Sequence, residues 1–130
     1  MFLGSYEPSF DPISKRVALP KKIRDYLATS EIILSYGFER CILGFDTKAF
    51  EKESTKQLSA VLSDRAARGS RRFFFSSARD ISVDSQGRIV IPGDLLNWAQ
   101  IKKPVVIGAG DHFEIWDKSN WRREKHNLAK

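Results

Sequence analysis

Short apolar runs, each followed by a turn, occur in both halves of the chain and predict short strands. Residues 6–10 and 79–83 are expected to form one strand each and to lead into a hairpin turn. After the second turn, Ile89 and Ile91 share one face of a return strand because side chains alternate with a period of two. Arg88 is therefore expected to project from the opposite face.

The first return strand repeats this pattern, with Val17 and Leu19 at its apolar positions and Arg16 on the outward face. A proline ends each return strand, at Pro20 and Pro92. Proline is favoured in the first turn of a helix, where its missing N–H costs nothing. The two short helices predicted on this ground cover residues 21–28 and 94–100.

A β-hairpin is predicted next in each half, because two apolar runs are separated by glycine. The paired runs are residues 32–34 with 40–43 and residues 105–107 with 113–116. An aspartate follows each hairpin, and Asp46 and Asp117 are expected to cap helices that carry Phe50 and Trp121.

The first of these helices is predicted to continue to about residue 66, because apolar residues recur at helical spacing, and to end at residues 69–70. Residues 71–78 contain three consecutive phenylalanines, which would not be left in water. This segment is therefore predicted to be a linker that packs between the two halves or against another subunit.

The order of these landmarks is the same in both halves, which indicates an internal duplication. Units of about fifty residues bury too little surface to be stable alone, so the two copies are expected to share one core in an α+β fold. The expected divisions are residues 5–48 for the first repeat, 49–76 for a helix and linker, 77–120 for the second repeat and 121–130 for a helical tail.

Basic residues cluster in two windows without any acid, residues 15–24 and 65–79, in a chain whose net charge is +6. Such windows are typical of proteins that bind a phosphate backbone, although a solvated basic face is the alternative. The predicted DNA-binding residues are Lys15, Arg16, Lys21, Lys22, Arg24 and Arg88. The predicted interface or solvated residues are Arg65, Arg68, Arg71 and Arg72.

The acidic turns are expected to shape the basic loops rather than to touch DNA. Asp84 and Gly87 occupy the first and fourth positions of a type I turn, and Asp11 opens the corresponding first loop. The first loop is one residue longer, and Lys15 stands where the second loop has Gly87. An ion pair that only holds the hairpin remains an alternative role for Arg88.

Other functional classes have weaker support. No apolar run approaches the ~20 residues that span a bilayer, and the N-terminus lacks the pattern of a secretory signal, so a cytosolic protein is expected. The single cysteine, Cys41, is interpreted as a core residue. His112 and His126 lie in unrelated settings, and no cofactor, metal site or small-molecule substrate is expected. The enzymatic alternative is that Asp11 and Asp84 form a pair of carboxylates that binds a metal ion.

The chain resembles the MraZ family in several pieces that occur together. These are Met1-Phe-Leu-Gly, the doubled acidic-turn-arginine-proline unit, Arg71-Arg-Phe-Phe-Phe-Ser-Ser-Ala78 and Glu114-Ile-Trp-Asp-Lys-x-x-Trp121. The family hallmark, an aspartate followed four residues later by arginine, is matched by Asp84 and Arg88; the first loop departs from it.

This resemblance implies two tandem SpoVT/AbrB-type repeats of the swapped-hairpin kind, with a pseudo-symmetric, β-barrel-like core and peripheral helices. It also implies a DNA-binding transcriptional regulator, located in the cytoplasm and nucleoid, that acts on repeated operators upstream of the division and cell-wall gene cluster, its own promoter included. A ring-like homo-oligomer, an octamer or larger, is expected. An antitoxin or interaction module is the alternative, and a small carboxylate-dependent enzyme is a more distant one.

Overall fold

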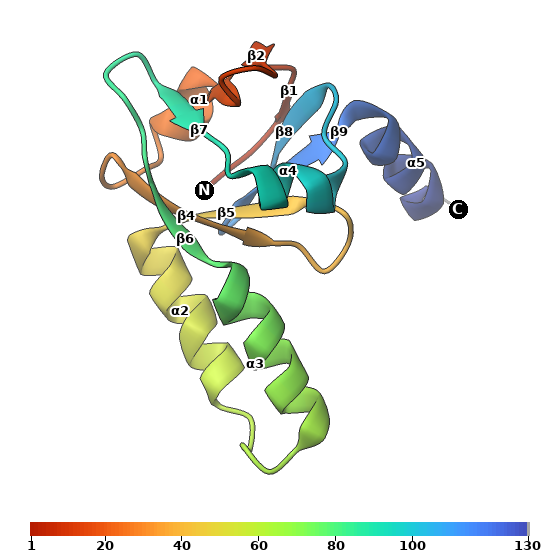
Figure 1. The fold of residues 1–130 in the computed structure, drawn as a ribbon. Coiled ribbons are helices and arrows are strands. Elements are labelled where there is room, and N and C mark those ends of the chain that lie inside the picture. The colour runs from red at the N-terminus through yellow and green to blue at the C-terminus, as the bar shows by residue number, and fades with distance from the viewer. Residues whose placement is uncertain (130) are drawn as a thin grey trace.

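The computed structural model describes residues 1–129, in which two β-sheets and five helices are arranged in layers (Figure 1). The strands are β1 (Ser5–Tyr6), β2 (Phe10–Asp11), β3 (Arg16–Ala18), β4 (Glu31–Tyr36), β5 (Ile42–Asp46), β6 (Arg79–Ser82), β7 (Arg88–Val90), β8 (Pro104–Gly108) and β9 (Phe113–Asp117). The helices are α1 (Lys21–Arg24), α2 (Thr47–Leu58), α3 (Arg65–Ser77), α4 (Gly93–Ala99) and α5 (Lys118–Leu128).

The larger sheet joins the two repeats at its centre. Its strand order is β1-β8-β9-β5-β4-β6, and the hairpins β4–β5 and β8–β9 meet where β5 pairs with β9. Both faces are buried, so successive residues of β5 enter different cores: Ile42 packs with the smaller sheet and Leu43 packs toward the helices. The expected hairpins and the shared core are therefore confirmed.

Two apolar clusters hold the layers together. One lies between the two sheets and includes Val17, Ile89 and Ile115, while the other lies under α2 and α3 and includes Phe50 and Phe74. Figure 1 shows α2 and α3 as an antiparallel pair that projects beyond the sheets. The α+β class is confirmed. The barrel-like core is not, because both sheets within residues 1–129 are open rows with free edges.

The long helix predicted over residues 47–66 was wrong, because the chain forms two helices separated by a loop. α2 ends at Leu58, and Asp64 begins α3 by accepting a hydrogen bond from the backbone N–H of Ala67 at 3.2 Å. This N-cap starts a new helix at a point where the apolar spacing alone would have continued the first one. Gly69 lies inside α3, where it is exposed, so it does not end a helix.

The phenylalanine segment is also helical rather than a linker, since α3 extends to Ser77. Its predicted packing between the halves is observed: Phe73 contacts Tyr36 of the first repeat and Trp98 of the second, with ring centroids 5.5 and 5.3 Å apart. Phe74 is fully buried. Within residues 1–129 no helix is both long and apolar enough to cross a membrane.

The sequence predicted the helix caps more accurately than the helix lengths. Asp46 accepts from the N–H of Ala49 at 2.7 Å, and Asp117 caps α5 through Ser119, so both predicted N-caps are confirmed. α1 is shorter than the predicted residues 21–28, and the strand expected at residues 6–10 is divided into β1 and β2. Pro8 lies between these two strands and has no N–H for a sheet ladder.

Candidate nucleic-acid interface

The two arginine-bearing return strands, β3 and β7, lie side by side in the smaller sheet. They pair antiparallel, with Val17 opposite Ile89. Two further backbone bonds extend the ladder symmetrically: the N–H of Leu19 donates to the carbonyl of Gly87, and the N–H of Ile91 donates to that of Lys15, both at 2.9 Å. The duplicated units therefore meet about a local pseudo-twofold axis.

The exposed face of this strand pair carries the two arginines. Val17 and Ile89 are buried against the larger sheet, so the alternate residues, Arg16 and Arg88, point outward, as the period of two predicts. Val90, which lies opposite Arg16, is also exposed. The predicted orientation of both arginines is confirmed.

In the second loop, Asp84 organises the turn and holds Arg88. Its carboxylate accepts hydrogen bonds from the backbone N–H groups of Gln86 and Arg88 and from Nε of Arg88, at 2.9, 2.8 and 3.0 Å. The backbone bond from Arg88 is the largest of the influences that lower the pKa of Asp84. Gly87 has φ +77°, a left-handed conformation that glycine adopts without strain.

In the first loop, Asp11 shapes the turn without holding the arginine. Its carboxylate accepts from the hydroxyl of Ser14 at 2.8 Å and from the N–H of Ile13 at 3.0 Å, and these bonds lower its pKa. Lys15 takes the left-handed conformation, φ +60°, that Gly87 has in the other loop. Among residues 1–129 Arg16 forms no ion pair with a carboxylate, so its guanidinium is available to an external anion.

The basic residues after Pro20 differ in their availability. Lys21 forms an exposed ion pair with Asp25 at 3.1 Å. Arg24 donates Nε to the carbonyl of Leu19 at 3.1 Å and lies against Gly87, so it supports the second loop. Lys22 lines a separate hollow beside Tyr26. Arg16 and Arg88 thus line one hollow at the strand pair, whereas Nζ of Lys15 lies near Gly93 at the start of α4. Lys21, Lys22 and Arg24 all belong to α1.

A shallow hollow of about 320 Å³ separates Arg16 from Arg88 on this face. Its walls include three small residues that sequence reasoning missed, which are Ser9, Ser14 and Ala18. Ser14 carried a signal, because a serine three residues after an aspartate suits a local side-chain bond. Ala18 shares the face of Arg16 through the period of two, but its place opposite Arg88 comes from strand pairing, which the sequence alone does not specify. Ser9 joins them because its carbonyl accepts from the N–H of Ala18.

This arrangement is suited to binding an anion. Guanidinium groups match phosphate oxygens and the O6/N7 edge of guanine. Asp11 and Asp84 are each engaged by their own loop, and residues 1–129 contain no group of three or more histidine, cysteine, aspartate or glutamate side chains placed to hold a metal ion.

Comparison with known proteins agrees with the duplicated structure. A family model described as "MraZ protein, putative antitoxin-like" matches the chain twice, over residues 1–73 and 74–130. A protein of Micrococcus luteus named "Transcriptional regulator MraZ" is 44% identical over 93% of this chain and 84% of its own length. Proteins of the same name from Kocuria rhizophila and Roseiflexus castenholzii are 42% and 37% identical, over 95% and 94% of this chain and 85% of each relative. The chain belongs to the MraZ family.

Proposed function

We propose that this protein is a DNA-binding transcriptional regulator whose contact surface is the exposed face of β3 and β7 with its two loops. The observation that carries the proposal is the antiparallel pairing of β3 with β7, which brings Arg16 and Arg88 onto one outward face. A two-stranded ribbon is among the elements that enter the major groove of DNA. The name shared by its relatives supports a regulatory role.

Each residue has a proposed part in this contact. Arg88, oriented by Asp84 through Nε, presents its terminal guanidinium nitrogens to a base edge or phosphate. Arg16 and Lys15 contact the DNA backbone from the other loop. Lys21, Lys22 and Arg24 add positive charge beside the face, and Asp11, Asp84 and Gly87 keep the loops in shape.

Repeated operators and self-association complete the proposal. One pair of loops offers few contacts, so we infer that several subunits, in a ring-like homo-oligomer of eight or more, engage successive DNA repeats at high effective concentration. Linked binding of this kind raises avidity by roughly 10²–10⁴. The family resemblance points to operators upstream of the division and cell-wall gene cluster, including the protein's own promoter, and to a nucleoid location in the cytoplasm.

The test is fluorescence anisotropy on duplex DNA from upstream of the protein's own gene, titrated at several salt concentrations. Arg16→Ala and Arg88→Ala are each expected to weaken binding and to reduce the slope of log K against log salt by about one unit if the arginine binds a phosphate. Arg122→Ala, which removes an exposed arginine from α5, is the matched control and should bind as the wild type does. Unchanged binding by both loop variants, in proteins that still fold and assemble, would remove the assignment.

A second candidate rests on the antitoxin-like description of the family model. An antitoxin neutralises a partner, so deletion of its gene should be toxic and should become harmless when the gene of that partner is also deleted. A regulator should instead change transcript levels from its operator. The two outcomes separate these functions in one set of strains.

A further inference from the structure

The tip of the α2–α3 hairpin exposes three aliphatic side chains on a part of the molecule that projects from the sheets (Figure 1). Leu58, Val61 and Leu62 are 54, 69 and 63% exposed. Scattered single apolar residues are ordinary on a surface, whereas three neighbours at one protruding tip are typical of an interaction site. We call these three residues the apolar tip.

The loop that carries the apolar tip is fixed by two arginines. Arg71 donates to the carbonyl of Leu58 at 3.1 Å and also to that of Ala60. Arg68 donates to the carbonyls of Leu62 and Ser63 at 3.2 and 2.9 Å. These bonds satisfy carbonyls at the end of α2 and in the loop, so the aliphatic side chains are presented on an ordered backbone.

Basic side chains border the apolar tip. Arg65, Arg68 and Arg72 are spaced by three and four residues along α3, which places them on one face of the helix. Arg68 is engaged with the loop, while Arg65 and Arg72 are exposed and form no ion pair within residues 1–129. The projecting surface is therefore apolar at its end and positively charged along its side.

A hollow of complementary character lies between α2, the β4–β5 turn and β9. Its volume is about 340 Å³, at the lower end of the roughly 300–1,000 Å³ of small-molecule pockets, which suits one or two side chains. Its apolar lining comes from Phe38, Leu43 and Phe45, and its charged lining comes from Glu39, Glu53, Asp111, Glu114 and His112. We call this the acidic hollow.

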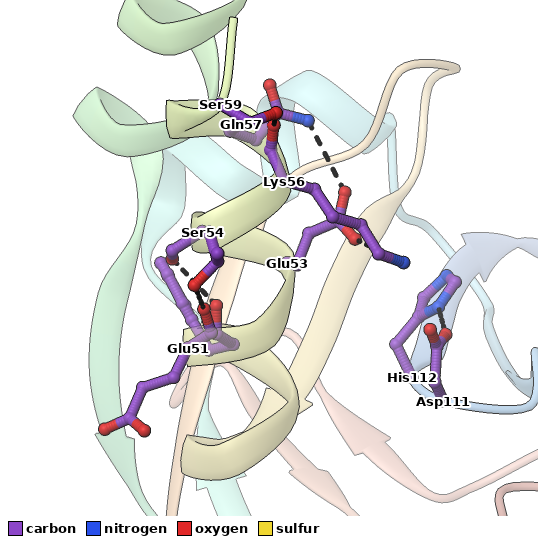
Figure 2. A network of polar contacts seen from close by, with 10 residues as sticks. Glu51, Glu53, Ser54, Lys56, Gln57, Ser59, Asp111 and His112 are labelled. Atoms are coloured by element: carbon purple, nitrogen blue, oxygen red, sulfur yellow. Dashed lines mark hydrogen bonds and ion pairs between the residues drawn. The ribbon is translucent and has the colours of Figure 1, made fainter.

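The charges of the acidic hollow are partly ordered by His112. Its two ring nitrogens lie 2.8 Å from Asp111 and 2.9 Å from Glu114, and its ring stacks on Phe45. Figure 2 shows Glu53 and Lys56 on the side of α2 that faces His112. Glu39 forms no ion pair in the described chain, and the hollow keeps an excess of carboxylates in a protein of net charge +6.

We propose that the apolar tip of one copy of this chain docks in the acidic hollow of a second copy. Charge complementarity selects this occupant, because the exposed arginines of α3 meet exposed carboxylates at Glu39 and Asp111. The tip and the hollow are different surfaces of one chain, so the contact is head-to-tail and closes into a ring when its rotation allows. This contact would supply the assembly step of the proposed function, and the inference rests on that function.

Charge reversal with rescue tests this contact. The tip variant is Arg65→Glu with Arg72→Glu, the hollow variant is Glu39→Arg with Asp111→Arg, and the fourfold variant combines them. Sedimentation velocity across a concentration series should show assembly weakened by about tenfold or more in either variant, because like charges then face each other. The fourfold variant should recover assembly, since opposite charges face each other again.

A matched control for the tip variant changes the net charge by the same amount elsewhere. Arg122→Glu with Lys125→Glu on α5 should leave assembly as in the wild type. A monomeric wild type, or tip and hollow variants that assemble normally, or a folded fourfold variant that does not recover, would each overturn the proposed contact. Binding to a DNA fragment with a single repeat, measured on the same variants, reports separately on the β3–β7 face, so failure of one proposal is distinguishable from failure of the other.

Discussion

Replacing Gly87 by alanine tests whether the second loop needs the backbone conformation seen here. An added Cβ would lie 2.6 Å from Nε and 2.7 Å from Cδ of Arg24, too close for any real contact. The flexible side chain of Arg24 would have to move, and we expect its hydrogen bond to the carbonyl of Leu19 to be lost. In addition, a residue with a Cβ is strained at φ +77°.

The expected loss follows from these two effects. A left-handed conformation costs about 1–2 kcal/mol for an alanine, and the lost hydrogen bond contributes about 0.5–1.5 kcal/mol. Alanine also lowers the conformational entropy of the unfolded chain, which stabilises the folded state by about 0.4–1 kcal/mol and offsets part of this loss. We therefore expect Gly87→Ala to lower the free energy of unfolding by about 2 kcal/mol. The measurement is urea denaturation at one fixed protein concentration, because the proposed self-association would make the apparent stability depend on concentration.

Two companion variants make the result interpretable. Gly69 lies in α3 with no atom near the position of an added Cβ, so Gly69→Ala should stabilise the protein by up to about 1 kcal/mol. Lys15→Gly should also stabilise it, since Lys15 already has φ +60°. If Gly87→Ala proves as stable as the wild type while Gly69→Ala gains stability, the described geometry of the second loop is incorrect.

Three other predictions concern stability and reactivity. Asp117 caps α5 and accepts hydrogen bonds from two N–H groups of the α4–β8 loop. Asp117→Ala should therefore lower the free energy of unfolding, measured by urea denaturation, by about 2 kcal/mol. Burial raises the pKa of the Cys41 thiol, so Cys41 should react with a thiol reagent only after unfolding. Burial tends to lower the pKa of His112, but Glu114 and Asp111 together raise it. A histidine whose folded pKa is raised contributes to the free energy of unfolding; the contribution is complete below the ordinary pKa of about 6.5 and is lost as the pH rises through the folded pKa. His112→Gln should therefore remove this decline from the unfolding free energy measured from about pH 6 upward.

Local features were predictable from the sequence because they depend on neighbouring residues. The alternation around Arg88 and Arg16 fixed which way each arginine points, and Asp46 and Asp117 were recognisable as caps from their position before a helical segment. The division of the long helix was missed because apolar spacing continued past Leu58, and the capping role of Asp64 was overlooked.

Long-range pairing was not predictable in the same way. β3 and β7 are far apart in the chain, and nothing local specifies that Val17 lies opposite Ile89. The backbone conformation of Lys15 shows the same limit. Lys15 and Gly87 both have positive φ, and each accepts a backbone hydrogen bond from the other repeat, but a lysine carries no signal for a left-handed backbone. The face between Arg16 and Arg88 is thus a product of tertiary structure.

Because the unit is duplicated within one chain, the basic face forms within a single subunit, whether or not subunits assemble. Because β3 and β7 belong to the same chain, their pairing is intramolecular and does not depend on protein concentration. The apolar tip and the acidic hollow lie on other elements, α2, α3 and β9, so they can be altered without changing the strands that carry Arg16 and Arg88. On the proposed assembly, a tip variant should therefore lose the avidity of linked subunits on repeated DNA, while a single subunit keeps its own weak affinity for DNA. An arginine variant of the face should lose that affinity in every assembly state.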